Sequence, residues 1–258
     1  MVAHMNIFDS HAHYDHEAFD NDRLELLNRL PLSGVTGIIN AGTSVGSSLK
    51  SLELAARFSY VYAAAGIHPE DAGNACITDV KKIGDMASRA KKIVAIGEIG
   101  LDYHYEGFDK ITQIELFEAQ LALANDLSLP VIVHDRDAHA DTMGLLQKYK
   151  PRGVLHCFSG SIETAAQAVS IGLYLGFTGV ITFKNSRRVA GVIASIPRER
   201  ILVETDCPYM APEPLRGHRC DSSMLIHTIC SVASLLGLEP DAAAAMTAQN
   251  AKMLFHIG

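Results

Sequence analysis

Short apolar runs alternate with longer amphipathic stretches along most of the chain. Each run is rich in β-branched and small apolar residues and ends in polar residues or glycine. The runs that predict strands are 6–13, 34–42, 61–68, 93–98, 131–134, 153–156, 174–178 and 201–206. Between them, apolar residues recur at intervals of three and four, which indicates amphipathic helices. The clearest helix candidates are 47–58, 111–127, 138–149 and 161–171.

This alternation predicts a parallel sheet, because successive parallel strands need a helical crossover between them. Eight such units in 258 residues match the size of a (β/α)8 TIM barrel. A doubly wound open sheet is the competing α/β fold, and a glycine-rich turn after the first strand, absent here, would favour it. No linker interrupts the rhythm, so we expect a single TIM-barrel domain over 1–258, with Met1–His4 set aside as a candidate expression remnant.

Composition and charge narrow the class of protein. Hydrophobic residues make up 48% and charged residues 20% of the chain, an ordinary globular balance. No apolar run reaches the roughly 18–20 residues of a membrane helix, and the N-terminus lacks the apolar core of a signal peptide, so we expect no membrane association. The five cysteines are odd in number and form no C-x-x-C pair, which favours reduced thiols in a cytoplasmic protein. The net charge of −7 disfavours a broad basic surface for nucleic acid but permits phosphates to be held locally.

Histidine and carboxylate side chains gather where the predicted strands end. The carboxyl ends of all strands of a TIM barrel point at one rim, where active sites form. The residues at these ends are His11, His13, His68, Glu98, His134, His156 and Asp206. Taken singly, each has an ordinary alternative as a satisfied polar residue. Together, at the ends of separate strands, they predict a metal site.

Four of these imidazoles and both carboxylates are enough ligands for two divalent metal ions. The predicted ligands are His11, His13, Glu98, His134, His156 and Asp206. His11 and His13 share one face of a strand because they are two residues apart. Glu98, from the middle of the strand order, is the candidate bridge between ions about 3.5–4 Å apart. Asp206 is the candidate base for the attacking water, so Glu98 and Asp206 are the predicted catalytic residues.

Several local strings, spread from Phe8 to Phe255, carry a family resemblance. They are HAHYD, GIHPEDA, GEIGLDYH, PVIVHDRDAH, GVLHCFSGS, GFTGVITFK, ILVETDCPYMAPEPLRG and TAQNAKMLF. Together they resemble the TatD family of metal-dependent deoxyribonucleases. The resemblance implies a (β/α)8 hydrolase that cuts DNA phosphodiesters, commonly 3′ to 5′ and supported by magnesium. It also implies that one ion is held by His11, His13, Glu98 and Asp206, and the second by Glu98, His134 and His156.

Two features of the sequence depart from the family pattern. The segment that follows Gly217, often basic and rich in Asn and Pro in relatives, reads HRCDSS here. This departure bears on polymer preference and polarity rather than on metal binding. Ala12 stands where relatives often have Cys, but strand alternation turns this side chain away from the metals. The metal itself is open between magnesium, implied by the resemblance, and manganese or zinc, which suit imidazole ligands better.

Four residues near the rim are candidate substrate contacts. Arg136 is expected either to hold a phosphate bidentately or to pair with a neighbouring aspartate. Lys184 is either a phosphate contact or a solvated loop charge, and Arg216 lies in the proline-rich loop after the last strand. His68 either donates to a phosphate or leaving group or makes a structural hydrogen bond in its loop.

The remaining rim residues carry weaker signals. Tyr103 and His104 closely follow Glu98 and either stack on a base or pack at the rim. Cys157 and Cys207 directly follow predicted ligands, and strand alternation turns them toward the helices as packing residues. His16 has no partner pattern.

Three functions are compatible with these residues. The first is a metal-dependent deoxyribonuclease that works from a strand end and binds DNA locally at the barrel rim. The second is a hydrolase of another bond, such as the ester of a D-aminoacyl-tRNA or a lactone, because an activated water serves either chemistry. The third is an inactive barrel that acts as a scaffold, and it ranks last because all six predicted ligands are present.

Overall fold

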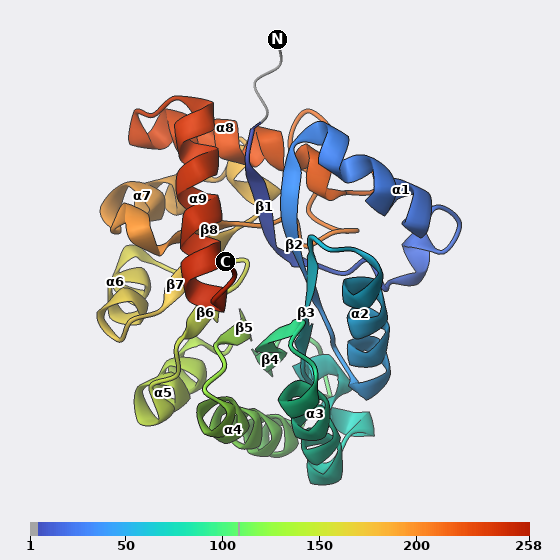
Figure 1. Cartoon of the computed structure of the whole chain (residues 1–258). Helices are drawn as coiled ribbons and strands as arrows, with labels where there is room; N and C mark the ends of the chain where they lie inside the picture. Colours follow the sequence, from blue (N-terminus) through green and yellow to red (C-terminus); the bar gives the residue numbers. More distant parts are fainter. Residues whose placement is uncertain (1–4, 108) are drawn as a thin grey trace.

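All eight predicted strands are present in the computed structural model, which describes residues 5–107 and 109–258. The strands form one parallel sheet in sequence order, and it wraps into a barrel with the helices outside (Figure 1). The strands are β1 (Ile7–Ala12), β2 (Val35–Ala41), β3 (Val61–Ala65), β4 (Ile93–Asp102), β5 (Val131–Arg136), β6 (Gly153–Leu155), β7 (Tyr174–Phe177) and β8 (Ile201–Val203). The TIM barrel expected from the sequence is confirmed, while the proposal about residues 1–4 lies outside the described residues.

Helices alternate with these strands. The α-helices are α1 (Arg23–Arg29), α2 (Val45–Arg57), α3 (Ile77–Arg89), α4 (Lys110–Leu127), α5 (His139–Tyr149), α6 (Ile162–Ser170), α7 (Arg187–Ser195), α8 (Leu225–Leu236) and α9 (Pro240–Phe255). Short 3-10 helices are η1 (Glu17–Phe19), η2 (Leu30–Ser33), η3 (Pro69–Asn74), η4 (Gly179–Thr182), η5 (Arg198–Arg200) and η6 (Ser222–Met224). The four predicted helices correspond to α2, α4, α5 and α6. Side-chain caps explain three of their starts: Ser44, Asp109 and Ser161 accept hydrogen bonds from the first turns of α2, α4 and α6.

The barrel closes between its last and first strands, next to predicted ligands. An isolated parallel bridge joins Ala12 to Cys207. The Asp206 amide donates to the His11 carbonyl over 2.9 Å, and the His13 amide donates to the Cys207 carbonyl over 2.9 Å. Closure of the sheet therefore brings Asp206 beside His11 and His13, although they are almost 200 positions apart.

A cluster of apolar side chains fills the barrel at the end opposite the predicted metal ligands. Phe8, Ile132 and Leu202, each the second residue of its strand, pack inside the barrel with Leu254 and Phe255 of α9. Helix α9 therefore covers the amino-terminal ends of the strands, as Figure 1 shows. This leaves the carboxyl-terminal rim as the end where a site can open.

Strand β4 runs four residues beyond the predicted end at Glu98 and finishes at Asp102. Gly100 makes this extension possible. Its φ is +146°, and a Cβ there would lie 2.0 Å from the His134 carbonyl oxygen, so a side chain would prevent β4 from pairing closely with β5. The extension carries Asp102 alongside the end of β5.

In the described part of the chain, no helix by itself is long and apolar enough to cross a membrane. The segments Ser222–Leu236 and Pro240–Phe255 pass that test only as a pair, and the pair bends by 103° at its break.

Candidate metal centre

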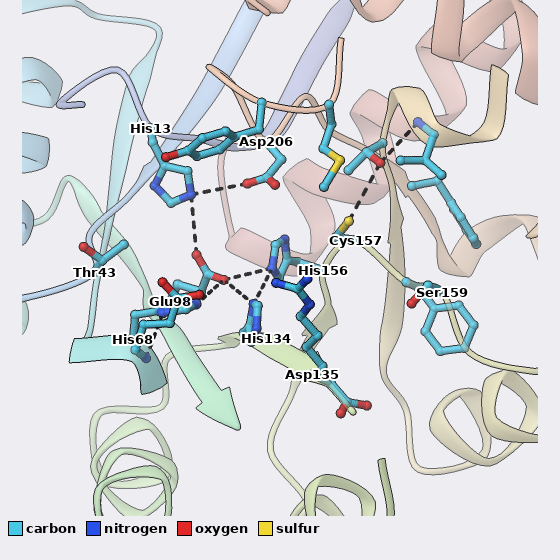
Figure 2. A pocket seen from close by; sticks show the side chains of 18 of the residues that line it. His13, Thr43, His68, Glu98, His134, Asp135, His156, Cys157, Ser159 and Asp206 are labelled. Atoms are coloured by element: carbon cyan, nitrogen blue, oxygen red, sulfur yellow. Dashed lines mark hydrogen bonds and ion pairs between the residues drawn. The ribbon is translucent and has the colours of Figure 1, made fainter. Parts of the chain in front are cut away.

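The carboxyl-terminal ends of the strands surround a cavity of about 710 Å³, within the usual range for ligand sites. Most of the predicted ligands line it, namely His13, Glu98, His134, His156 and Asp206. His11 lies directly beneath them and is fully buried. Figure 2 shows Glu98 in the middle of this group, with imidazoles approaching it from several strands. The structure thus brings all six predicted ligands together.

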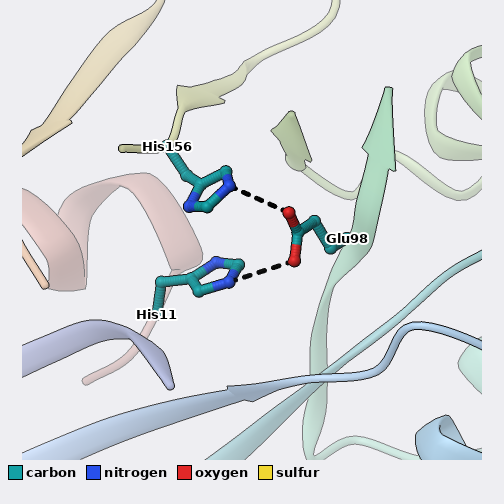
Figure 3. A group of neighbouring side chains, drawn as sticks. All are labelled: His11, Glu98 and His156. Atoms are coloured by element: carbon teal, nitrogen blue, oxygen red, sulfur yellow. Dashed lines mark ion pairs between the residues drawn. The ribbon is translucent and has the colours of Figure 1, made fainter. Parts of the chain in front are cut away.

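The two carboxylate oxygens of Glu98 face two separate groups of imidazoles. Oε2 lies 3.2 Å from His11 Nε2 and 3.5 Å from His13 Nε2. Oε1 lies 2.8 Å from His156 Nε2 and 3.0 Å from His134 Nδ1. Figure 3 shows this division for His11 and His156, which approach different oxygens of the same carboxylate. A carboxylate with this surrounding is arranged to bridge two cations.

The separations within the first group fit a divalent ion. His11 Nε2 lies 2.9 Å from His13 Nε2, and Asp206 Oδ1 lies 3.6 and 3.4 Å from these two nitrogens. Ligand bonds of about 2.0–2.1 Å place neighbouring ligand atoms about 3.0–3.4 Å apart around an ion. Two imidazole lone pairs directed at one point also repel each other unless a proton or a cation lies between them. The donor set therefore fits a metal ion.

Hydrogen bonds to the outer nitrogens select the tautomers that metal ligands need. The Nδ1 atom of His13 lies 2.9 Å from the Ala41 carbonyl oxygen, and His134 Nε2 lies 2.8 Å from Asp102 Oδ2. Both oxygens only accept, so these two nitrogens carry hydrogen and donate. The opposite nitrogen of each ring, which faces Glu98, keeps its lone pair for an ion.

His68 lies beside the second group but has the opposite tautomer. Its Nδ1 accepts a hydrogen bond of 3.1 Å from the Glu70 amide and caps η3. Neutral His68 therefore carries its hydrogen on Nε2, which lies 3.3 Å from Glu98 Oε1. Although His68, Glu98 and His134 are close enough to hold an ion, this tautomer makes His68 a donor rather than a ligand. The loop hydrogen bond expected as one alternative for His68 is present, whereas donation to a phosphate or leaving group stays a prediction.

The carboxylates of the cluster stabilise protonated imidazoles at the positions where a metal ion would bind. Burial opposes charge on Glu98, but the charges of His156, His68 and His11 hold its pKa well below the usual value. Burial likewise opposes protonation of His13, yet its hydrogen bond to Asp206 and the charge of Glu98 raise its pKa to about 9. Against the same cost of burial, hydrogen bonds to Asp102 and Glu98 raise the pKa of His134 to about 8.

Metal affinity is expected to rise steeply with pH. A protonated imidazole cannot ligate, so an ion must displace the protons of His13 and His134, whose pKa values are raised to about 9 and 8. The pKa of His156, another imidazole beside Glu98 Oε1, is raised well above its usual value, so affinity is expected to increase with pH through about pH 8 to 9 without levelling off there. Calorimetric titration of Mn²⁺ in buffers of different ionisation enthalpy measures both the affinity and the protons released. An affinity that is independent of pH, without proton release, contradicts this expectation.

Two buried carboxylates that the sequence analysis missed support the histidines. Asp102 accepts from His134, as described above, and is only 2% exposed. Glu204 is fully buried. It accepts from the Cys157 amide over 2.5 Å and lies 3.6 Å from His156 Nδ1. Gly176 makes room for it, because a Cβ there would lie 2.3 Å from Glu204 Oε2. The available signal was alternation, since Glu204 precedes Asp206 by two residues and shares its face.

Replacing Asp102 by asparagine is expected to weaken metal binding at His134. The neutral amide holds the imidazole less firmly and makes it less basic. Substitution of a residue that hydrogen-bonds a metal ligand in this way lowers metal affinity roughly 10- to 100-fold. The matched control is Asp85→Asn, an exposed position on α3. Mn²⁺ titration of both variants checks the expectation, and equal affinities would show that Asp102 does not position His134.

Arg136, at the end of β5, is the predicted phosphate contact that the structure places in the cavity. Its Nη1 donates to the Tyr105 hydroxyl over 3.3 Å, and its guanidinium lies 5.1 Å from the centre of that ring. The expected alternative, an ion pair with Asp135 or Asp137, is not formed. These carboxylates accept instead from His139 and His104.

Lys184 and Arg216 are not brought into the cavity. Both are exposed, and neither belongs to the cavity lining. Arg216 lies against Phe183, with its guanidinium 4.5 Å from the ring centre. The 3-10 helix η4 follows β7 and contributes Val180 and Ile181 to the cavity wall, so Lys184 lies beyond the wall. The structure therefore gives no support to these two predicted contacts.

Two other rim predictions, for Cys157 and His16, need correction. Cys157 lines the cavity instead of packing toward the helices, because its φ of +45° interrupts strand alternation. Burial raises the pKa of this thiol to about 12, so it is not a nucleophile. His16 also lines the cavity. Of the two alternatives for Tyr103, packing at the rim agrees with the structure; neither Tyr103 nor His104 lines the cavity, and the aromatic residue of the β4 loop that does is Tyr105.

Comparison with known proteins agrees with this geometry. Residues 8–256 match the family described as TatD related DNase. The metal-dependent hydrolase YabD of Bacillus subtilis is 37% identical over 97% of this chain and 99% of its own. The 3'-5' ssDNA/RNA exonuclease TatD of Cronobacter sakazakii is 35% identical over 96% of this chain and 97% of its own.

A solved structure is similar over the same extent. The crystal structure of YJJV, a TatD homologue from Escherichia coli K12, has a TM-score of 0.94 and 30% identity. The match covers 99% of this chain and 100% of that one. With barrel, ligand cluster and sequence in agreement over nearly the whole length, this chain belongs to the TatD family of metal-dependent hydrolases.

Proposed function

We propose that this protein is a two-metal phosphodiesterase that removes nucleotides from a DNA end in the 3′-to-5′ direction. The observation that carries the proposal is Glu98, whose two oxygens face separate groups of imidazoles. The name of the Cronobacter relative, a 3'-5' ssDNA/RNA exonuclease, supports the substrate and the polarity. DNA is bound locally at the rim. The protein works in the cytoplasm, a proposal supported by its five free cysteines.

The donor set divides between two ions. One would be held by His11, His13, Glu98 and Asp206, and the other by Glu98, His134 and His156. Two divalent ions there would supply a water of lowered pKa and would neutralise charge on the phosphate oxygens. Magnesium supports activity, and manganese or zinc bind the same imidazoles well.

Three side chains near the ions act on the attacking water, the phosphate and the leaving group. The Asp206 carboxylate borders the cavity with its side chain 13% exposed, and it accepts the proton of the attacking water. Arg136 is the cation of the cavity wall and donates to a phosphate oxygen. His68, whose Nε2 hydrogen points into the cavity, donates to the leaving oxygen.

Degradation of end-labelled single-stranded oligodeoxynucleotides tests the proposal. With Mg²⁺, a 5′-labelled strand is expected to shorten stepwise, while a 3′-labelled strand releases its label as a mononucleotide at once. Added EDTA is expected to stop both reactions. Shortening from the 5′ end would overturn the polarity. An absence of cleavage with Mg²⁺, Mn²⁺ or Zn²⁺, despite two bound ions, would overturn the nuclease.

An ester hydrolase is the second candidate, and one feature of the cavity favours it. Over β6 to β8 the cavity wall is apolar, which suits an acyl group as well as a base. Its side chains are Phe158, Phe177, Val180, Ile181, Val189 and Met210. The two candidates differ in their need for a cation, because an ester carries no phosphate charge.

Arg136→Ala separates the two candidates. For a nuclease, loss of a charge-assisted contact is expected to lower kcat/KM on DNA by roughly 10- to 100-fold. Hydrolysis of p-nitrophenyl acetate is expected to change little. Arg216→Ala is the matched control, because that arginine lies outside the cavity. A larger loss on the ester than on DNA would favour the second candidate.

A further inference from the structure

Two exposed tyrosines border the cavity on opposite sides of the barrel. Tyr105 is 54% and Tyr209 is 52% exposed, and both line the cavity. Tyr105 follows β4 and Tyr209 follows β8, which lie across the barrel from each other in the strand order. The pKa of Tyr209 is raised by burial first, then by the charge of Asp206 and more weakly by that of Tyr105. The two phenols therefore border one mouth from opposite sides of the barrel.

A polar neighbour orients each ring. Tyr105 accepts from Arg136, whose guanidinium also lies over the ring. The Tyr209 hydroxyl lies 3.2 Å from His16 Nε2, and these two rings meet edge to face with centres 5.7 Å apart. Rings that are held in place lose less side-chain entropy when a flat ligand stacks on them.

Most charged side chains around the mouth are negative, so contacts with the phosphates of a DNA strand add little affinity there. Among the described residues that line the cavity, Arg136 is the one arginine or lysine. Against it are four carboxylates besides Glu98 and Asp206, namely Asp15, Glu70, Asp71 and Asp135. Nucleic-acid affinity that rests on the backbone needs several cations to neutralise phosphates. Beyond the phosphate at the metal centre, the bases are therefore the part of a strand that this surface can hold.

We propose, building on the nuclease function above, that Tyr105 and Tyr209 form an aromatic clamp that stacks on unpaired bases at the end of the strand. Every base has an aromatic face, so the clamp accepts any sequence. Bases within a duplex are already stacked on each other and paired, so the clamp selects single-stranded ends. The acidic residues around the mouth keep distant phosphates from adding affinity, so binding depends weakly on salt.

Binding of two fluorescein-labelled oligodeoxynucleotides, measured by anisotropy with Ca²⁺, tests the clamp. One is an ordinary single strand, and in the other the last three residues at the 3′ end are abasic. The wild type is expected to bind the ordinary strand at least about 5- to 150-fold more tightly, the range for one stacked base. Tyr105→Ala and Tyr209→Ala are expected to reduce this ratio toward 1. The phenylalanine variants, which keep the ring, are expected to retain it.

Leu32→Ala is the control, because Leu32 is 83% exposed in η2, before β2 and away from the rim. Equal binding of both oligonucleotides by the wild type, or binding of neither, would overturn the clamp. An alanine variant that keeps the full ratio would remove that tyrosine from the clamp. Cleavage with Mg²⁺ is measured in parallel. Base-dependent binding without cleavage overturns the nuclease alone, whereas cleavage without base dependence overturns the clamp alone.

Discussion

Glu98→Ala is expected to abolish hydrolysis and to remove both metal ions together. Glu98 faces both groups of imidazoles, with Oε2 3.2 Å from His11 and Oε1 2.8 Å from His156. Without it, four buried imidazoles lose the negative charge that balances two cations. The loss of metal affinity is expected to exceed the roughly 100-fold seen when outer partners of ligands are removed.

Elemental analysis of the purified variant, with oligonucleotide cleavage beside it, measures this result. Glu98→Gln removes the negative charge but keeps the size of the side chain, and it is expected to lose the metal ions as the alanine variant does. Glu70→Gln is the matched control, since Glu70 also lines the cavity but belongs to no candidate ligand cluster among the described residues. A Glu98→Ala protein that keeps two ions per chain would show that another group forms the bridge.

Asp206→Asn is expected to lower kcat strongly while one ion remains bound. The substitution removes the carboxylate that lies 3.4 Å from His13 and 3.6 Å from His11. The group formed by Glu98, His134 and His156 stays intact. Loss of a positioned base costs roughly 10²- to 10⁴-fold in rate, and the weakened first ion adds to this loss.

The ratio of ions to protein distinguishes the two variants, with near zero expected for Glu98→Ala and near one for Asp206→Asn. Single-turnover cleavage shows that the loss lies in chemistry rather than in binding. Asp71→Asn, another carboxylate of the cavity wall, is expected to retain two ions and most of the activity. If Asp206→Asn keeps both ions and nearly full kcat, the base must be sought elsewhere in the cavity.

The six predicted ligands could be found from sequence because they occupy the ends of strands. Strand ends are visible as the point where an apolar run gives way to polar residues, and parallel connectivity sends all of these ends to one rim. His134 and Asp206 therefore line the same cavity for a reason that local patterns already contain. Arg136, expected on the loop after the strand of His134, is instead the last residue of β5 and lines the same cavity.

Predictions that relied on side-chain direction beyond the strand ends were less successful. Alternation assumes an extended backbone, and Cys157 has a left-handed φ of +45°, so its side chain turns into the cavity. Asp102 was missed because β4 continues past Glu98 through Gly100. Lys184 and Arg216 lie in loops whose paths depend on η4 and on packing against Phe183.

The sequence by itself determined the barrel, the order of its strands and the set of candidate metal ligands, because hydrophobic periodicity and strand ends are local properties of the chain. Only the tertiary structure decided how these side chains face one another. It directed the two oxygens of Glu98 to different imidazoles, set the tautomers of His13 and His134 through distant acceptors, and placed Tyr105 and Tyr209 across one mouth. These features depend on barrel closure and on hydrogen bonds between residues far apart in sequence, which no local pattern records.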